Sequence, residues 1–309
     1  MTVHSFLGAF GFYLRKAFPR LCGKAYLAYL RLVLNRPYRE FIAQALALEY
    51  LVPRFIHIET INRCNGSCPF CPCNKHHDRR PLKKMSEDLF DRIISDLAGH
   101  DYDGILMLSG NCEPFLDDRI VKFINIANEK IPKAQKILYT NGTLLTAEKL
   151  KGIAGKLDIL YVNNYSRDYR LIGPVGEIYE YVKTHAADFR DMRVKIELRY
   201  ADEVLSNKRG EAPNNRNAKT IYRNVCPHPY METIIFPDGL VGLCCNDSQG
   251  ETNFGDLKTA GLYEIFNSEK LRAVRWAMKD GRNGYEFCQY CDFMSQQGRR
   301  LKWMKSGRD

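Results

Sequence analysis

The chain has 309 residues, of which 45% are hydrophobic and 27% charged, and its formal net charge is +10. This balance is typical of a globular protein with one large core or two domains. No apolar run reaches the ~18–20 residues that a membrane-spanning helix needs, and the N-terminal apolar stretch precedes its basic residues, unlike a secretory signal. We therefore expect a cytoplasmic protein, in which clustered cysteines bind metal or do chemistry more often than they form structural disulfides.

The positive charge gathers at the two ends of the chain. Residues 1–56 carry eight Lys or Arg against two acidic residues, residues 299–309 carry five against one, and residues 57–298 are neutral. A nucleic-acid enzyme would carry its basic residues along a central groove, so we expect no nucleic-acid partner. Basic ends suit an acidic protein or a membrane surface, and solvated ends are the alternative.

Residues 5–52 are rich in Leu, Ala and aromatic residues and are predicted to be helical. Asn35-Arg36-Pro37 interrupts this pattern, which resumes before Pro53. The first helix resembles an interfacial membrane helix, because apolar residues are followed by basic ones. We weigh this membrane contact against docking of a partner and against packing on the rest of the protein. The residues concerned are Phe6, Leu7, Phe10, Tyr13, Leu14, Arg15, Lys16, Arg20 and Lys24.

From residue 54 the pattern changes to short β-type runs that alternate with helical ones. This alternation predicts βαβ units and a parallel sheet, curved or closed, with ligands at the C-terminal ends of the strands. The predicted strands are 54–60, 104–110, 136–142, 157–164 and 194–200, and the predicted helices are 86–100, 117–130, 146–156 and 176–189.

A cysteine loop follows the first predicted strand directly. Cys64, Cys68 and Cys71 have the spacing C-x3-C-x2-C. A structural zinc site needs four ligands, and Cys73 lies only two residues from Cys71, an awkward pair for one metal. Three thiolates would instead leave one iron of a four-iron cluster open to a substrate or cofactor.

This loop resembles the signature of the radical S-adenosylmethionine (SAM) superfamily, C-x3-C-x-aromatic-C, with Phe70 as the aromatic residue. Two further stretches resemble the family: Ser109–Asp117, which contains Glu113-Pro114, and Thr140-Asn141-Gly142. The resemblance implies a partial (β/α)6 barrel of the TIM type over residues 54–205. It also implies that the three cysteines hold a 4Fe–4S cluster, at which SAM is reductively cleaved to a 5′-deoxyadenosyl radical that abstracts hydrogen from a substrate.

Five residues are implied to contact SAM. Phe70 would pack by the adenine, and Glu113 would accept a hydrogen bond from the methionyl amine. Asn141, Asn163 and Arg199 lie at strand ends, where ribose and carboxylate contacts belong. Cys112 departs from the family, which has glycine at this position.

A second cysteine set follows a polar stretch, residues 206–219, which reads as a linker or long loop. Around Asp238-Gly239 the sequence predicts a β-hairpin. The set resembles the SPASM/twitch domains, and its shortness implies one fully ligated 4Fe–4S cluster, although spacing alone would also suit zinc. We expect three parts: a helical extension (1–53), the barrel (54–205) and the auxiliary-cluster domain (206–309). The implied ligands are Cys226, Cys244, Cys288 and Cys291.

The function expected from this resemblance is oxidation of a secondary alcohol of a sugar or aminocyclitol. An epimerase of a sugar or peptide is an alternative, with Cys112 or Cys245 as hydrogen donor. A ribosomal-peptide maturase is another, and an iron–sulfur or zinc scaffold is the non-enzymatic one. The substrate would be a small molecule or a peptide, and the reductant an acidic low-potential flavodoxin or ferredoxin.

Overall fold

The computed structural model describes residues 35–215 and 220–293. The predicted interfacial helix and the basic C-terminal end lie outside these residues. No helix in the described part is long and apolar enough to cross a membrane.

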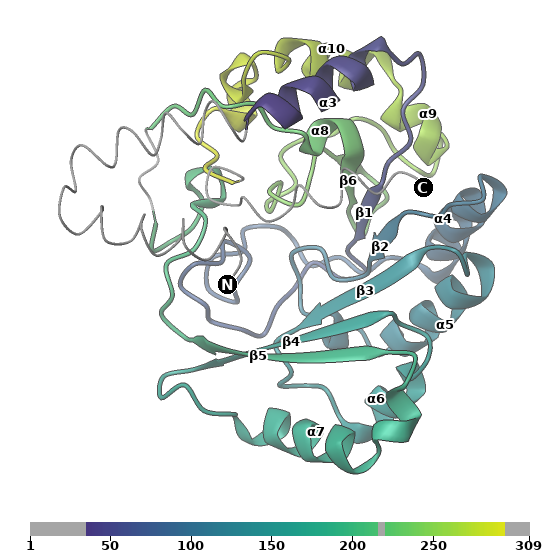
Figure 1. Cartoon of the computed structure of the whole chain (residues 1–309), viewed down its shortest axis with the longest axis vertical. Helices are drawn as coiled ribbons and strands as arrows, with labels where there is room; N and C mark the ends of the chain where they lie inside the picture. Colours follow the sequence, from purple (N-terminus) through teal and green to yellow (C-terminus); the bar gives the residue numbers. More distant parts are fainter. Residues whose placement is uncertain (1–34, 216–219, 294–309) are drawn as a thin grey trace, which may run out of the picture.

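The described residues form one seven-stranded, mostly parallel sheet with the order β5-β4-β3-β2-β1-β6-β7 (Figure 1). Strands β1 to β5 are parallel neighbours in sequence order, β6 adds to the free side of β1 in parallel, and β7 is antiparallel to β6. This arrangement confirms the predicted partial barrel. The strands are β1 (Phe55–Ile58), β2 (Ile105–Met107), β3 (Gln135–Thr140), β4 (Ile159–Ser166), β5 (Arg193–Tyr200), β6 (Glu232–Ile235) and β7 (Val241–Gly242).

Four helices connect β1 to β5 and cover one face of the sheet (Figure 1). Ser86 begins the first of them by accepting a hydrogen bond from the Leu89 N–H. Phe90 and Phe123 then stack across two neighbouring helices, with ring centroids 4.2 Å apart. The helices are α4 (Glu87–Gly99), α5 (Ile120–Lys130), α6 (Ala147–Ile153) and α7 (Gly173–Thr184), with 3-10 turns η2 (Pro114–Leu116) and η3 (Ala186–Phe189).

The C-terminal segment shares the core of the barrel. Leu262 and Phe266 belong to the same buried cluster as Phe90 of α4 and Ile56 of β1. In this cluster, apolar side chains of the C-terminal helices meet the outer face of the barrel. The elements are η4 (Lys208–Gly210), α8 (His228–Met231), α9 (Leu262–Phe266), α10 (Glu269–Ala277), η5 (Arg282–Gly284) and η6 (Glu286–Cys288).

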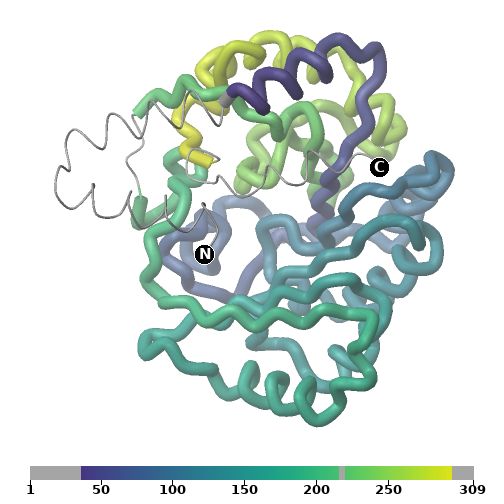
Figure 2. The backbone as a smooth tube through the Cα atoms, in the orientation of Figure 1, coloured from purple at the N-terminus to yellow at the C-terminus, as the bar shows by residue number. Residues whose placement is uncertain are grey.

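Helix α3 (Asn35–Ala47) lies beside the C-terminal segment (Figure 2). Its Tyr38 and Ile42 pack against Val225 and Tyr230 in a small separate cluster. Residues 35–37, predicted to interrupt the helical pattern, lie in the first turn of α3. Proline is favoured in the first turn of a helix, where its missing N–H has no partner to lose.

The inner face of the barrel is closed at one end by apolar residues. Ile105, Ile137 and Ile159, from three adjacent strands, form a buried cluster. Tyr139 and Tyr161 pack on this cluster, and their rings stack 4.5 Å apart. The loops at the C-terminal ends of the strands therefore lie above an aromatic layer, which positions the site.

Candidate functional site

The first cysteine loop is folded by its own backbone hydrogen bonds. The Cys71 N–H donates to the Cys68 carbonyl at 3.1 Å, and the Gly66 N–H donates to Cys64 Sγ at 3.3 Å. A Cβ placed on Gly66 would lie 3.3 Å from Cys64 Sγ and 3.7 Å from Cys68 Sγ. Glycine thus leaves open the space beside the thiols that a cluster would use.

These thiols are poor nucleophiles without a metal. Burial raises the pKa of Cys64 to about 12 and that of Cys68 to about 11, and it also raises the pKa of Cys71. A thiolate is the form that binds metal, so a positively charged cluster core would stabilise the thiolates that burial alone disfavours. Three neighbouring thiols in this setting fit an iron–sulfur cluster.

Glu113 holds the end of β3 against the cysteine loop. Its carboxylate accepts hydrogen bonds from Thr140 Oγ1 at 2.7 Å, the Asn141 N–H at 2.8 Å and the Phe115 N–H at 3.2 Å. Asn141 Nδ2 donates to Asn65 Oδ1 at 2.8 Å and lies 4.0 Å from Cys64 Sγ. Both oxygens of Glu113 therefore have partners within the chain, and its contact with the methionyl amine stays a prediction.

Phe70 and Arg199 meet at the same place on the inner face. Phe70 packs against Tyr165 of β4, with ring centroids 5.3 Å apart, and the Arg199 guanidinium lies 5.9 Å from the same ring. Asn163 precedes Tyr165 by two positions in β4 and so faces the same side. Arg199 also pairs with Glu203 at 2.5 Å, a partner that the sequence did not indicate.

A buried ion network, which the sequence analysis missed, supports this loop. Arg80 pairs with Glu59 at 2.7 Å and with Asp78 at 2.9 Å. Glu59 also accepts a hydrogen bond from the Asn111 N–H at 2.8 Å. Burial acts to lower the pKa of Arg80, but the two carboxylates outweigh it and raise that pKa. The network connects the end of β1 to the stretch around Cys112. No sequence motif predicts this network.

The second cysteine set lines one cavity. Cys244, Cys288 and Cys291 are buried, and burial raises the pKa of Cys226 to about 11. Arg209 and Arg282 line the same cavity. Four thiols, three of them buried, converge on this cavity from three separate segments and fit a fully ligated cluster.

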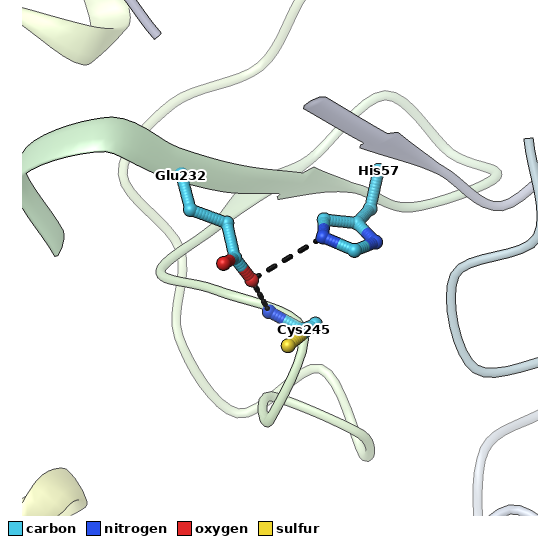
Figure 3. A group of neighbouring side chains, drawn as sticks. All are labelled: His57, Glu232 and Cys245. Carbon is cyan, nitrogen blue, oxygen red and sulfur yellow. Dashed lines mark hydrogen bonds and ion pairs between the residues drawn. The ribbon is translucent and has the colours of Figure 1, made fainter. Parts of the chain in front are cut away.

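Cys245 belongs to a polar group beside this set (Figure 3). Its Sγ lies within 4.8 Å of a ring nitrogen of His57 and of a carboxylate oxygen of Glu232. Glu232 accepts from the Cys245 N–H at 2.7 Å and lies 3.3 Å from His57 Nε2, and its other oxygen pairs with His228. Burial acts to raise the pKa of Glu232, but His228 and His57 outweigh it and hold that pKa well below the usual value. This shared carboxylate fixes Cys245 to β6.

Cys112 is the other candidate hydrogen donor. Its thiol donates to the Ser109 carbonyl at 2.8 Å within its own turn, and burial raises its pKa well above the usual value. Its backbone N–H also donates to the Ser109 carbonyl, at 3.0 Å. Both bonds fix this residue next to Glu113, and a role as hydrogen donor stays a prediction.

The two cysteine-bearing loops touch each other directly. The Cys73 thiol donates to the Ser248 carbonyl at 3.0 Å, and Gln249 Nε2 donates to the Pro72 carbonyl at 2.9 Å. On the other side, Asn111 Nδ2 donates to the Cys245 carbonyl at 3.0 Å. The fold therefore brings the two cysteine sets, far apart in sequence, to one face of the barrel.

Comparison with known proteins agrees with this architecture. A protein in Niallia circulans, the S-adenosyl-L-methionine-dependent 2-deoxy-scyllo-inosamine dehydrogenase, is 24% identical over 245 residues, 78% of this chain and 94% of its own. The tungsten-containing aldehyde ferredoxin oxidoreductase cofactor-modifying protein of Pyrococcus furiosus is 27% identical over 157 residues, 50% of this chain and 41% of its own.

Among solved structures, BtrN in complex with AdoMet and 2-DOIA has the same fold. It superposes with a TM-score of 0.67 at 23% identity and covers 79% of this chain and 94% of its own.

Two family models match the chain. The radical SAM superfamily model matches residues 58–190, and the SPASM model, an iron–sulfur cluster-binding domain, matches residues 226–292. These matches confirm the predicted cofactors: SAM, a 4Fe–4S cluster in the first domain and an auxiliary iron–sulfur cluster in the second. The chain is therefore a radical SAM superfamily enzyme with a C-terminal SPASM-type domain.

Proposed function

We propose that this protein oxidises a secondary alcohol of a sugar or aminocyclitol to a ketone. The observation that carries the proposal is that the segment of the second cysteine set contacts both the first cysteine loop, through Ser248 with Cys73, and the loop after β2, through Cys245 with Asn111. An auxiliary cluster that adjoins the SAM site in this way can receive an electron from a substrate held between them. The relative from Niallia circulans is a dehydrogenase of this kind, which supports the same reading.

The proposed ligands follow from the two sets. Cys64, Cys68 and Cys71 would hold the SAM-binding cluster, and Cys226, Cys244, Cys288 and Cys291 the auxiliary one. When bound, the first cluster and SAM supply a carbon-centred radical that removes a hydrogen atom from the substrate. The substrate then loses its hydroxyl proton and one electron, which leaves a ketone.

The residues of the chain would position the reactants for this step. Phe70 and Tyr165 would form an aromatic surface beside the nucleoside, and Arg199 would offer a cation above it. Asn141 and Asn163 would donate and accept hydrogen bonds at strand ends. The stacked Tyr139 and Tyr161 would form the floor of this space and help to shield it from water.

Epimerisation is the second candidate function. Cys245 lies at the contact between the two loops and is partly exposed, so a thiol is present where a hydrogen donor would be needed. In epimerisation the Cys245 thiol would give a hydrogen atom to the substrate radical, and the thiyl radical left behind would need one electron and one proton to become a thiol again. A Cys245→Ala variant that still forms product would exclude this role for Cys245.

We also propose that an acidic low-potential flavodoxin or ferredoxin reduces the first cluster in the cytoplasm. The net charge of +10 supports this choice, because a basic protein attracts an acidic donor. Contact of residues 1–24 with a membrane is the competing proposal for the basic N-terminal end. Deleting residues 1–20 separates them: slower flavodoxin-driven turnover with normal dithionite-driven turnover indicates docking, and loss of vesicle binding indicates the membrane.

The test of the main proposal uses anaerobically reconstituted, dithionite-reduced protein with SAM. Candidate polyols and aminocyclitols are screened for stimulation of 5′-deoxyadenosine formation. The expected result is one ketone formed for each 5′-deoxyadenosine, with deuterium transferred from the carbinol carbon of a labelled substrate. An epimer in place of a ketone would contradict the proposal, and so would no deoxyadenosine at all.

A further inference from the structure

Arg282 is a buried cation that has no acidic partner among the described residues. The residue is 1% exposed and lines the cavity formed by the second cysteine set. Its Nε donates to the Asn224 carbonyl at 3.2 Å, and its Nη1 donates to the Cys291 carbonyl. Its Nη2 is buried and has no hydrogen-bond partner among the described residues.

The absence of a carboxylate makes this burial costly. Across residues 35–215 and 220–293, no acidic oxygen pairs with the Arg282 guanidinium. A buried, unpaired charge costs several kcal/mol, and proteins normally pair such a group or let it bind an anion. The buried Arg80, by contrast, has two carboxylate partners. An anion other than a carboxylate of the described residues is therefore expected next to Arg282.

The four thiolates of the cavity would supply this anion. A four-iron cluster held by four thiolates is anionic in its oxidised state and gains one more negative charge when it accepts an electron. Charge and hydrogen bonds at the sulfurs are known determinants of the reduction potential of such clusters. A guanidinium in the wall of the cavity stabilises the reduced state more than the oxidised one.

We propose that Arg282 is the counter-ion of the auxiliary cluster and raises its reduction potential, so that the cluster can accept the electron of the substrate radical. The source of the electron, a substrate radical, is taken from the proposed function, and this part of the proposal rests on it. The counter-ion role itself does not, because it concerns the cluster alone. Arg282 is a positioning residue in this scheme and does not contact the substrate.

Arg209 is a weaker second cation at the same cavity. Its guanidinium lies 3.6 Å from the Phe287 ring centroid, and its Nε donates to the Asn246 carbonyl at 3.2 Å. Its backbone has φ = 64°, a left-handed conformation that costs a non-glycine residue ~1–2 kcal/mol. Its charge is already shared with Glu251 at 3.1 Å. We therefore expect a smaller effect on the potential than from Arg282.

The test is a redox titration of the reconstituted holoenzyme, followed by electron paramagnetic resonance. Adding SAM changes the signal of the first cluster and so separates it from the auxiliary one. In an Arg282→Gln variant, the ratio of reduced to oxidised auxiliary cluster at a fixed potential should fall about tenfold, which is 59 mV for one electron. Arg282→Lys keeps the charge and should retain most of the wild-type ratio.

Arg275→Gln is the matched control. Arg275 is also buried, and its Nη1 and Nη2 have no hydrogen-bond partner among the described residues, but it lines a different cavity and stacks on Phe266. Its loss should leave the auxiliary potential unchanged. A ratio within twofold of wild type in Arg282→Gln, or an equal fall in Arg275→Gln, would overturn the proposal.

A second measurement needs no variant that must assemble a cluster. Wild-type holoenzyme labelled with guanidino-¹⁵N-arginine should show a ¹⁵N coupling to the reduced auxiliary cluster in pulsed magnetic resonance. The coupling should persist in Arg209→Gln. If no arginine nitrogen couples to the auxiliary cluster, the counter-ion role is wrong, whatever the variants do. If Arg282→Gln lowers the potential but the wild-type holoenzyme forms no ketone, the proposed function is wrong and the counter-ion role stands.

Discussion

The two cysteine sites differ in how the fold surrounds them. At the first, Cys64, Cys68 and Cys71 are partly exposed thiols of one loop. At the second, Cys244, Cys288 and Cys291 are buried, and with Cys226 they line one cavity. A partly exposed loop with three thiols can admit a further ligand to a metal, whereas a site that supplies four thiols leaves no position open on its cluster. The difference predicts chemistry at the first site and electron storage at the second.

The charges around the two sites differ in the same sense. Near the first, Arg80 is neutralised by Glu59 and Asp78. At the second, Arg282 faces the thiols without an acidic partner in the described chain. A cation without an acidic partner stabilises the reduced state of a neighbouring cluster, which suits a cluster that must accept an electron.

The largest expected effect comes from removing the first site. The triple change of Cys64, Cys68 and Cys71 to Ala should abolish SAM cleavage, because no open iron would remain. Iron should fall from about eight to about four per chain, since a second four-iron cluster stays in place. Iron analysis and detection of 5′-deoxyadenosine measure the two outcomes, and any remaining SAM cleavage would contradict the assignment.

Removing the second site should have a more selective effect. In the double variant Cys288→Ala and Cys291→Ala, the auxiliary cluster should be lost while uncoupled formation of 5′-deoxyadenosine survives. Ketone formation should fall by at least about tenfold, because the substrate radical would lack its electron acceptor. Zinc bound at these four ligands in wild-type protein, with only four irons per chain, would show that the second site does not store electrons.

The third prediction tests the charge balance at the first site. Glu59→Gln leaves the buried Arg80 with Asp78 alone and should lower the free energy of unfolding by about 3 kcal/mol, as breaking a buried ion pair does. The control is Glu40→Gln, which removes an exposed pair with Arg36 and should change stability by under about 0.5 kcal/mol. Anaerobic denaturant titration of both variants gives the difference, and equal values would refute a structural role for the network.

Most of the barrel was predictable from the sequence. Short runs rich in Ile, Leu and Val indicate buried parallel strands, and the five predicted ones correspond to β1 to β5. The hairpin at Asp238-Gly239 was also confirmed, since Ile235 pairs with Val241. The parallel pairing of β6 with β1 was not foreseen, because strand partners distant in sequence leave no local pattern.

The site was predictable where a residue belongs to a spaced motif. Cysteine spacing located both thiol sets, and the Thr140-Asn141-Gly142 stretch indeed lies against the first loop. Their assignment as ligands, and the domain boundaries at 53/54 and 205/206, stay predictions. Arg80 and Arg282 were missed because a charged residue in a loop usually faces solvent, and only the tertiary structure reveals that these two are buried.

The smallest expected effect tests how much room the first site needs. Gly66→Ala places a Cβ 3.3 Å from Cys64 Sγ, a contact tighter than most, while the backbone of Gly66 is outside the left-handed region and tolerates alanine. We expect a loss of about 1 kcal/mol in cluster or SAM binding, the low end for overpacking, seen as a roughly tenfold weaker affinity at most. Equilibrium binding of SAM to the reconstituted protein measures it. The control is Gly176→Ala in α7, where nothing lies within 4 Å of the added Cβ. That change should leave SAM binding unaltered and stabilise the helix by ~0.5–1 kcal/mol. If Gly66→Ala binds SAM and retains iron as wild type does, the space beside the thiols is wider than the loop geometry indicates, and the absence of a side chain at residue 66 serves the turn instead.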